Sequence, residues 1–191
     1  VQYVIRPQKD EYHDYRGYSG RVAGGIFKKG DEVVVLPAGF KAKITQLEHL
    51  GNEIEQAFPP MSINMCLDTD IDIDRGNMIV KELSQPKIDQ NVDLMICWMS
   101  ETPLVPGGKY TIKHNTNEAR CVIKETQYKI DINTLHRVQD SKDIGLNDIG
   151  RINIRTSKPL LYDPYKKNKI TGSVILIDET TNNTVAAGMI L

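Results

Sequence analysis

The segment RGYSGRVAGGIFKKGDEVVVLP, residues 16–37, decides the fold of this chain. Its KKGD tetrad, residues 28–31, has the composition of a tight turn, because Gly adopts positive φ without a steric penalty and Asp bonds nearby backbone. The run Glu32–Leu36 is β-branched and too short for a helix. The segment therefore predicts a hairpin of two strands, Arg16–Val22 and Asp31–Leu36, whose edge and apolar face need further strands.

Two more features of the first half follow from turn chemistry and alternation. A turn that ends in Gly-Asp needs left-handed backbone to match the strand twist, so we expect φ > 0 at Gly30. The stretch Lys41–Leu50 alternates between polar and apolar residues. It predicts a strand with Ala42, Ile44 and Leu47 on its buried face.

The rest of the chain repeats this pattern of short apolar runs separated by Gly and Pro. The 14 glycines and 9 prolines are scattered as punctuation, and no apolar stripe has a helical period over a useful length. The polar, Pro-containing segment Lys81–Lys87 predicts a domain boundary. We therefore predict an all-β protein of two consecutive antiparallel β-barrels, the first over residues 1–83 and the second over residues 84–191, because closure removes exposed edge strands.

Alternation within each run also predicts the two cores. The segment Leu160–Lys169 is expected to be a long loop, and the chain to end in a hairpin that turns at Asn182-Asn183. The residues expected in the first core are Val33, Val35, Ile44, Ile63, Leu67 and Ile79, and those expected in the second are Ile96, Trp98, Ile112, Val122, Ile154, Ile175 and Ile177.

Composition limits the partners and the compartment. The net charge of -1 gives no electrostatic reason to expect a nucleic-acid or membrane surface, and no apolar run approaches the ~18 residues of a membrane span. Three scattered cysteines, Cys66, Cys97 and Cys121, favour a reducing cytoplasm and small buried side chains over a disulfide framework. The start VQYVIRP has neither an initiator Met nor the features of a signal peptide, which predicts a cytoplasmic fragment of a longer protein.

Two spacings resemble those of ligand-binding loops, but the residue types at the required positions do not fit. Gly25 and Gly30 have the spacing of a phosphate loop, but Asp31 and Glu32 follow where a Lys and a hydroxyl are needed. The alternating acids of residues 68–74 suggest a calcium loop. Counted from Asp70, Arg75 takes the place of the required Gly and Lys81 that of the final Glu. An acidic edge with Ile71 and Ile73 turned inward is the favoured interpretation.

The remaining chemistry-bearing residues form no recognisable set. The four histidines, His13, His49, His114 and His136, lack ligand spacing, and Ser19, Ser62 and Ser100 lack a nucleophile context. Asn168-Lys169 lacks the Asp of a guanine-reading motif. The basic cluster Lys166, Lys167 and Lys169 is either a solvated loop or a contact to an anionic partner. We predict no catalytic, cofactor-binding or metal-ligating residue in this chain.

Longer motifs carry a family resemblance over the whole chain. They are VQYVIRP (1–7), the segment 16–37, IDIDRG (71–76), the region 98–107 with PLVPG, the pattern Tyr110-x-Ile112-Lys113, LNDIG (146–150) and TGSVILIDETTNNTVAAGMI (171–190). Together they resemble the GTP-binding large subunits of bacterial sulfate adenylyltransferase (ATP sulfurylase), members of the superfamily of elongation factor Tu. Asn77 departs from the Asp that the family often has there, and the loop 162–169 varies.

The resemblance implies two β-barrels like domains II and III of elongation factor Tu-like GTPases. It implies that GTP and Mg²⁺ bind an N-terminal G domain outside this chain, and that GTP hydrolysis drives a small catalytic subunit to make adenosine 5′-phosphosulfate from ATP and sulfate. Some members carry an adenylylsulfate kinase domain after the second barrel. The fragment alone is then expected to be inactive. The alternative is a barrel pair that holds tRNA or the ribosome, which the acidic residues 68–74 and the lack of a basic stripe disfavour.

Overall fold

The computed structural model describes residues 1–7, 15–139 and 143–191, and almost all of its regular structure is strand. The chain divides into two compact units, Val1–Pro86 and Lys87–Leu191. The predicted boundary between residues 83 and 84 falls within the short 3₁₀ helix η2 (Glu82–Ser84), three residues before the end of the first unit. The assignment of residues 1–83 and 84–191 to two separate domains remains a prediction. No helix in the described part of the chain is long and apolar enough to cross a membrane.

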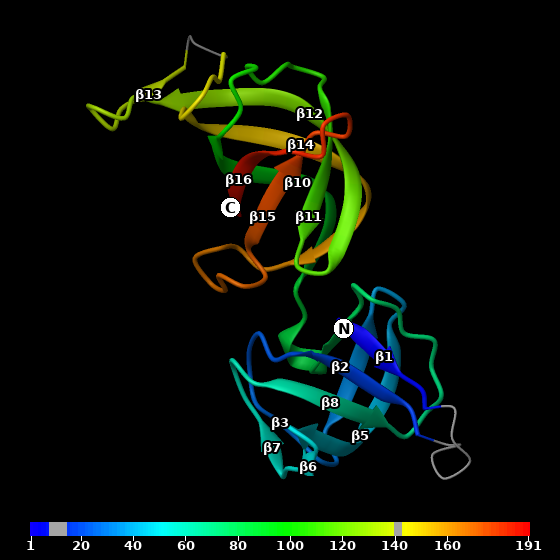
Figure 1. Ribbon diagram of the computed structural model, residues 1–191. Helices are drawn as coiled ribbons and strands as arrows, with labels where there is room; N and C mark the ends of the chain where they lie inside the picture. The colour runs from blue at the N-terminus through cyan, green and yellow to red at the C-terminus, as the bar shows by residue number, and fades with distance from the viewer. Residues whose placement is uncertain (8–14, 140–142) are drawn as a thin grey trace. The chain divides into compact units, whose positions relative to one another are not determined.

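The first unit is built on one antiparallel sheet with the strand order β1-β2-β8-β5-β4-β9, to which β6 adds on β5 (Figure 1). A separate pair, β3 and β7, completes it. The strands are β1 (Tyr3–Ile5), β2 (Gly17–Arg21), β3 (Phe27–Lys28), β4 (Glu32–Leu36), β5 (Phe40–His49), β6 (Asn52–Glu53), β7 (Gln56–Ala57), β8 (Ser62–Leu67) and β9 (Met78–Val80).

Backbone bonds outside the strands bring the two ends of this sheet together. The backbone nitrogen of Val1, two residues before β1, donates to the carbonyl of Asn77, directly before β9, at 2.5 Å. The amide of Gly76 donates back to the carbonyl of Val1 at 3.0 Å. Strands β1 and β9 do not share a ladder. The first barrel is closed instead by these two backbone hydrogen bonds.

Strand β5 confirms the predicted buried positions and shows why they break the alternation. Ala42, Ile44 and Leu47 are all buried, although two of them have even numbers and one is odd. The pairing of β5 with β8 shifts register between Ile44 and Gln46. The extra residue, Thr45, forms a bulge that returns Leu47 to the core face.

The predicted hairpin of residues 16–36 is wrong. Strand β2 pairs with β1 and β8, whereas β4 pairs with β5 and β9, and the two do not pair with each other. The connection between them makes its own contacts instead: Val22 is buried, its amide bonds the carbonyl of Met61, and β3 pairs with β7. The turn chemistry itself is confirmed, since Gly30 has φ +87° and links β3 to β4.

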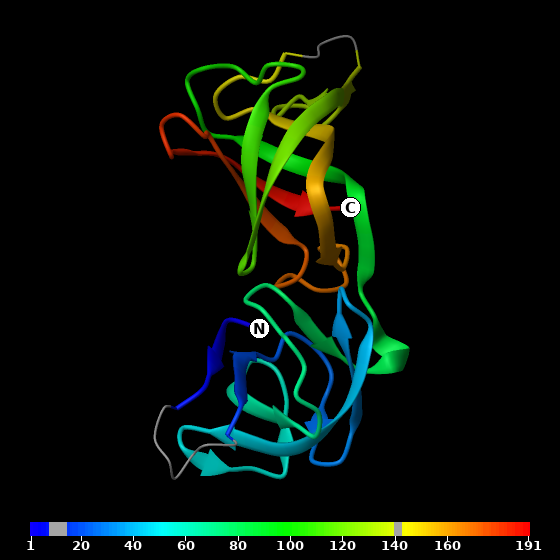
Figure 2. The same ribbon diagram turned by 90° about the vertical axis from the view of Figure 1, so that its right-hand side faces the viewer.

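The second unit is a closed antiparallel barrel of six strands. The order β11-β15-β16-β10-β14-β12 returns to β11, which also pairs with β12, and β13 extends β12 (Figures 1 and 2). The predicted terminal hairpin is present as β15 and β16. Its turn is longer than the predicted two residues, because the amide of Asp178 bonds the carbonyl of Asn183 and the amide of Asn182 bonds the carbonyl of Asp178. The strands are β10 (Lys87–Trp98), β11 (Lys109–His114), β12 (Asn117–Ile130), β13 (Arg137–Val138), β14 (Ile149–Tyr162), β15 (Ser173–Ile177) and β16 (Thr184–Ile190).

Most predicted core residues are buried, and the errors fall on strands that are apolar on both faces. Val122, Ile175 and Ile177 point outward and are half-buried, while their neighbours fill the second core. The runs CVI and SVILI have apolar side chains at consecutive positions, so alternation cannot tell which parity faces inward. Leu67 and Ile79 are half-buried and pack against the first core.

The predicted loop over residues 160–169 is also wrong at its start. Leu160, Leu161 and Tyr162 continue β14, are almost completely buried, and pair with the first residues of β10. The ladder between β10 and β14 is interrupted between Arg155 and Leu160, and Pro159 falls in this interruption. A proline is tolerated there because no ladder hydrogen bond is required of it.

Candidate functional site

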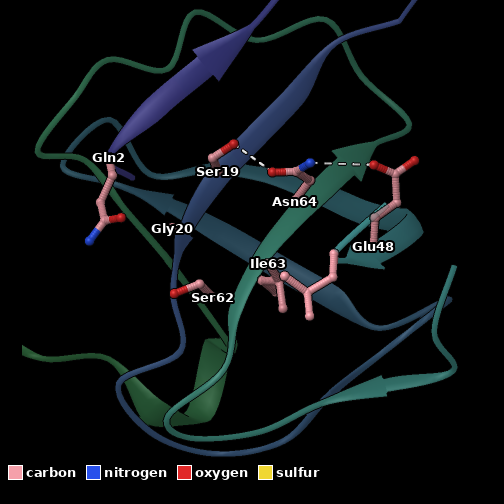
Figure 3. A pocket seen from close by; sticks show the side chains of 8 residues that line it. Gln2, Ser19, Gly20, Glu48, Ser62, Ile63 and Asn64 are labelled. Carbon is pink, nitrogen blue, oxygen red and sulfur yellow. Dashed lines mark hydrogen bonds between the residues drawn. The ribbon is translucent and has the colours of Figure 1, made fainter. Parts of the chain in front are cut away.

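A small pocket of about 130 Å³ lies on the first barrel, over three neighbouring strands of its sheet. It combines side chains that are far apart in the sequence, from the residue before β1, from β2, β5 and β8, and from the turn after β5. The lining residues are Gln2, Ser19, Gly20, Glu48, Leu50, Ser62, Ile63 and Asn64 (Figure 3).

A chain of hydrogen bonds fixes the polar wall of the pocket. The Ser19 hydroxyl donates to Asn64 Oδ1 at 2.5 Å, and Asn64 Nδ2 donates to Glu48 Oε2 at 3.4 Å (Figure 3). Outside the pocket, the Tyr15 hydroxyl donates to Glu48 Oε2 at 2.8 Å and Gln46 Nε2 donates to Oε1 at 3.0 Å. The Glu48 carboxylate is therefore held by three neutral donors.

The groups beside this carboxylate are not reactive ones. Burial, followed by the hydrogen bond to Glu48, raises the pKa of the Tyr15 hydroxyl well above its usual value. Burial also raises the pKa of the neighbouring Cys66 thiol. Because the thiolate is the nucleophilic form, Cys66 has the character of an inert thiol. The pocket can thus position and bind a group but offers no activated nucleophile.

The acidic connection before β9 is held by an arginine. Arg16 forms ion pairs with Asp70 and Asp72, and its NH2 is 3.1 Å from Asp72 Oδ1. The intervening Ile71 and the next apolar residue, Ile73, are buried, as predicted. Among residues 1–7, 15–139 and 143–191, no group of three or more His, Cys, Asp or Glu side chains is arranged to hold a metal ion.

The residues of the apparent phosphate loop are engaged with one another. The Asp31 carboxylate accepts a hydrogen bond from the amide of Lys28 at 2.8 Å, and the Asp31 amide bonds the Lys28 carbonyl at 3.1 Å. Gly25 and Gly30 both have positive φ, at +72° and +87°. The tetrad is a self-capped turn whose acidic side chain occupies the position an anion would need.

Among the described histidines, one lies beside the pocket and the others belong to the second barrel. His49 Nδ1 lies 2.7 Å from the carbonyl of Ser62 on the rim of the pocket, and His13 is outside the described residues. In the second barrel, burial lowers the pKa of His114, whose Nε2 lies 2.7 Å from the Thr171 carbonyl, and raises the pKa of Cys121 to about 12.

The loop after β14 is organised by its own side chains. Asn168 Oδ1 accepts from the amides of Ile170 and Thr171, at 2.9 and 3.3 Å. Lys167 pairs with Asp163 at 2.7 Å. Asn168 is therefore a capping residue of this loop.

Comparison with known proteins identifies a family for the second barrel. Residues 91–191, more than half of the chain, match the family model described as GTP-eEF1A C-terminal domain-like. The chain belongs to this family. The solved structure of Sup35 complexed with GDP has the same fold, with a TM-score of 0.86 over 99% of this chain and 45% of that one, at 15% sequence identity.

Other relatives are similar to this chain over both barrels. The bifunctional enzyme CysN/CysC of Mycobacterium tuberculosis is 47% identical over 192 residues, which include 100% of this chain and 31% of that protein. Sulfate adenylyltransferase subunit 1 of Bacteroides thetaiotaomicron is 42% identical over 199 residues, with 100% of this chain and 40% of that protein covered. The chain thus spans less than half the length of these family relatives.

Sequence reasoning missed the pocket. Ser19 and Ser62 were considered only as nucleophiles, Gln2 only as part of the motif VQYVIRP, and Glu48 and Asn64 belong to no motif. They meet only because β1, β2, β8 and β5 are neighbours in one sheet. One local signal was available: Leu50-Gly51 stands in a tight turn where Asn-Gly or Asp-Gly is favoured.

Proposed function

We propose that this chain is the non-catalytic β-barrel part of the GTPase subunit of a cytoplasmic sulfate adenylyltransferase. The observation that carries the proposal is 42–47% identity over the entire chain to proteins named sulfate adenylyltransferase subunit 1 and CysN/CysC. In this role the barrels connect GTP hydrolysis to the synthesis of adenosine 5′-phosphosulfate from ATP and sulfate during sulfate assimilation.

The barrels act in this proposal by positioning other parts of the enzyme. GTP and Mg²⁺ bind the N-terminal G domain, and the small catalytic subunit joins ATP and sulfate. An adenylylsulfate kinase domain follows the barrels in bifunctional members. The residues of this chain agree with a supporting role, because the only turn with phosphate-loop spacing among the described residues is capped by Asp31, and the Cys66 thiol beside Tyr15 is a poor nucleophile.

The alternative function, a barrel pair that holds tRNA or the ribosome, has less support. The likeness to Sup35 is one of fold, at 15% identity. A surface that neutralises phosphates needs a stripe of Lys and Arg. This chain has a net charge of -1, and residues 68–74 give the first barrel an acidic connection.

A domain exchange tests the proposal. The corresponding barrels of the Bacteroides thetaiotaomicron subunit are replaced by this chain, and GTP-stimulated synthesis of adenosine 5′-phosphosulfate is measured with that organism's small subunit. We expect stimulation to be retained, because the two proteins are 42% identical over the whole of this chain. The control chimera carries the barrels of Sup35, which share the fold but only 15% of the sequence, and should lose it.

Two further readouts separate the possible failures. Basal GTP hydrolysis by each chimera reports whether its G domain is folded, and co-purification reports whether the small subunit binds. If both chimeras are folded and equally unable to stimulate synthesis, the proposed function is wrong. Turnover of GTP or of ATP and sulfate by the 191-residue chain alone would contradict the non-catalytic role.

A further inference from the structure

Leu50 is a bulky apolar residue held in an unfavourable place. It lies with Gly51 between the paired residues His49 and Asn52, and both turn residues have positive φ, 50° and 80°. Such turns favour Asn, Asp or Gly at the first position, because a Cβ is strained in left-handed backbone. The Leu50 side chain nevertheless stays 87% exposed at the edge of the pocket. Strain of this kind, at a position with no packing to compensate for it, suggests that the side chain contacts something else.

The pocket beside Leu50 is rich in hydrogen-bond acceptors and carries one negative charge. Glu48 lies on one side and Gln2 and Ser62 on the other, with Asn64 between them (Figure 3). The donors that reach Glu48 are a phenol and two amides. None of the ion pairs among residues 1–7, 15–139 and 143–191 includes Glu48. A cationic donor group would complete this set.

We propose that the pocket binds an arginine side chain from an apolar segment of a partner polypeptide. The guanidinium donates to the Glu48 carboxylate and to the Ser62 hydroxyl, and Leu50 covers the aliphatic stem and an adjoining apolar residue. The planar fork of arginine suits a carboxylate whose orientation is already fixed by Tyr15 and Gln46. This interaction is additional to the proposed function and does not depend on it.

The size and charge of the pocket select this class of ligand. A volume of about 130 Å³ is well below the ~300–1,000 Å³ of sites for whole small molecules, so it admits one side-chain head group. An anionic nucleic-acid backbone would meet the Glu48 carboxylate and would be repelled. The apolar Leu50 adds contact area for a peptide but no stabilisation for phosphate.

A peptide titration of the 191-residue chain tests the proposal directly. The probes are the blocked peptides acetyl-Leu-Arg-Leu-amide and acetyl-Leu-Gln-Leu-amide, observed through the NMR signals of the Leu50 methyl groups and the Asn64 side-chain amide. We expect saturable shifts in the millimolar range with the arginine peptide, and affinity at least tenfold lower with the glutamine peptide.

Three variants assign the binding to these residues. Glu48→Gln should weaken the arginine peptide at least tenfold, whereas Glu55→Gln, which changes the net charge equally at an exposed position, should not. Leu50→Asn should also weaken binding, yet raise the unfolding midpoint, because Asn tolerates left-handed backbone. That opposite pair of effects cannot come from misfolding.

The proposal is overturned by any of three results. One is equal affinity for the two peptides, and another is unchanged affinity in folded Glu48→Gln protein. The third is a pocket that responds to a single-stranded oligoribonucleotide but not to the arginine peptide, which would mark it as a nucleic-acid site.

Discussion

The two barrels achieve closure in different ways. In the second, every strand of the ring pairs with both neighbours, and three strands have 12 or 14 residues. In the first, β1 and β9 have three residues each, and a backbone contact at Val1 and the buried connection around Ile71 complete the barrel. The difference shows that the same kind of barrel can be closed by continuous strand pairing or by the segments that connect its strands. We expect the second barrel to be most sensitive to core residues and the first to turn and connection residues.

The largest expected effect is in the core of the second barrel. Trp98 is 1% exposed, its Nε1 donates to the Thr102 carbonyl at 2.9 Å, and its ring meets Tyr110 edge-on. Trp98→Ala should lower the free energy of unfolding of this barrel by about 3–5 kcal/mol, measured by urea denaturation followed by circular dichroism. Met99→Ala, at the exposed next position, is the control. A loss below about 1 kcal/mol would contradict the expected reliance on the core.

A turn substitution should have the next largest effect, on the first barrel. Gly30 has φ +87°, and a Cβ there would approach only Lys43 Cε, at 3.8 Å. The penalty of Gly30→Val is therefore backbone strain of about 1–2 kcal/mol. Lys28→Ala in the same turn should change the free energy of unfolding by less than about 0.5 kcal/mol. If equilibrium denaturation ranks the two variants the other way, the first barrel does not depend on this turn.

A single hydroxyl tests the contribution of the acidic connection. Tyr18 is buried, and its hydroxyl donates to the Ile71 carbonyl at 2.8 Å. Tyr18→Phe leaves that carbonyl without this donor and should destabilise the first barrel by about 1 kcal/mol. Hydrogen exchange should quicken in β2 and β8 and stay unchanged in β14. Tyr3→Phe, at a side chain that is 68% exposed, should be silent in the same measurement.

The smallest expected effect is a pH dependence confined to the second barrel. Burial holds the pKa of His114 below its ordinary value, so the unfolded chain binds this proton more readily than the folded one. The contribution of His114 to the free energy of unfolding is therefore fully present above the ordinary histidine pKa of ~6.5. It is lost as the pH falls below that value. His114→Gln should lose less stability than the unaltered chain between pH 7.5 and pH 5. Equal losses would exclude His114 as the titrating group.

The sequence predicted the all-β class and many buried residues, because alternation and turn chemistry act locally. Ala42, Ile44 and Leu47 were identified despite the bulge at Thr45, since their apolar character marks the core face directly. Val122, Ile175 and Ile177 were misplaced because their strands are apolar on both faces. The hairpin of residues 16–36 was wrong because pairing depends on distant strands, and the turn at Gly30 is compatible with several partners.

The pocket could not be predicted for a related reason. Gln2, Glu48 and Asn64 belong to segments whose proximity is a property of strand order, which the sequence does not state. Leu50 is the exception. Its conflict with the turn is visible in four residues of sequence, and it is the position where local preference and the observed structure disagree.

The pairing of β10 with β16 also has a mechanical consequence. These strands run antiparallel, with Leu94 opposite Ile190, and the amide of Leu191 bonds the Asp93 carbonyl at 3.1 Å. Tension applied between Lys87 and Leu191 would first peel Lys87–Asp89 from β14 and then separate β10 from β16. The cross-strand hydrogen bonds are perpendicular to the strands. Pulling the two strands apart at one end of the ladder would therefore break these bonds one after another from that end. The second barrel would then yield to pulling at its ends by unzipping, at forces lower than those needed to shear a whole ladder at once.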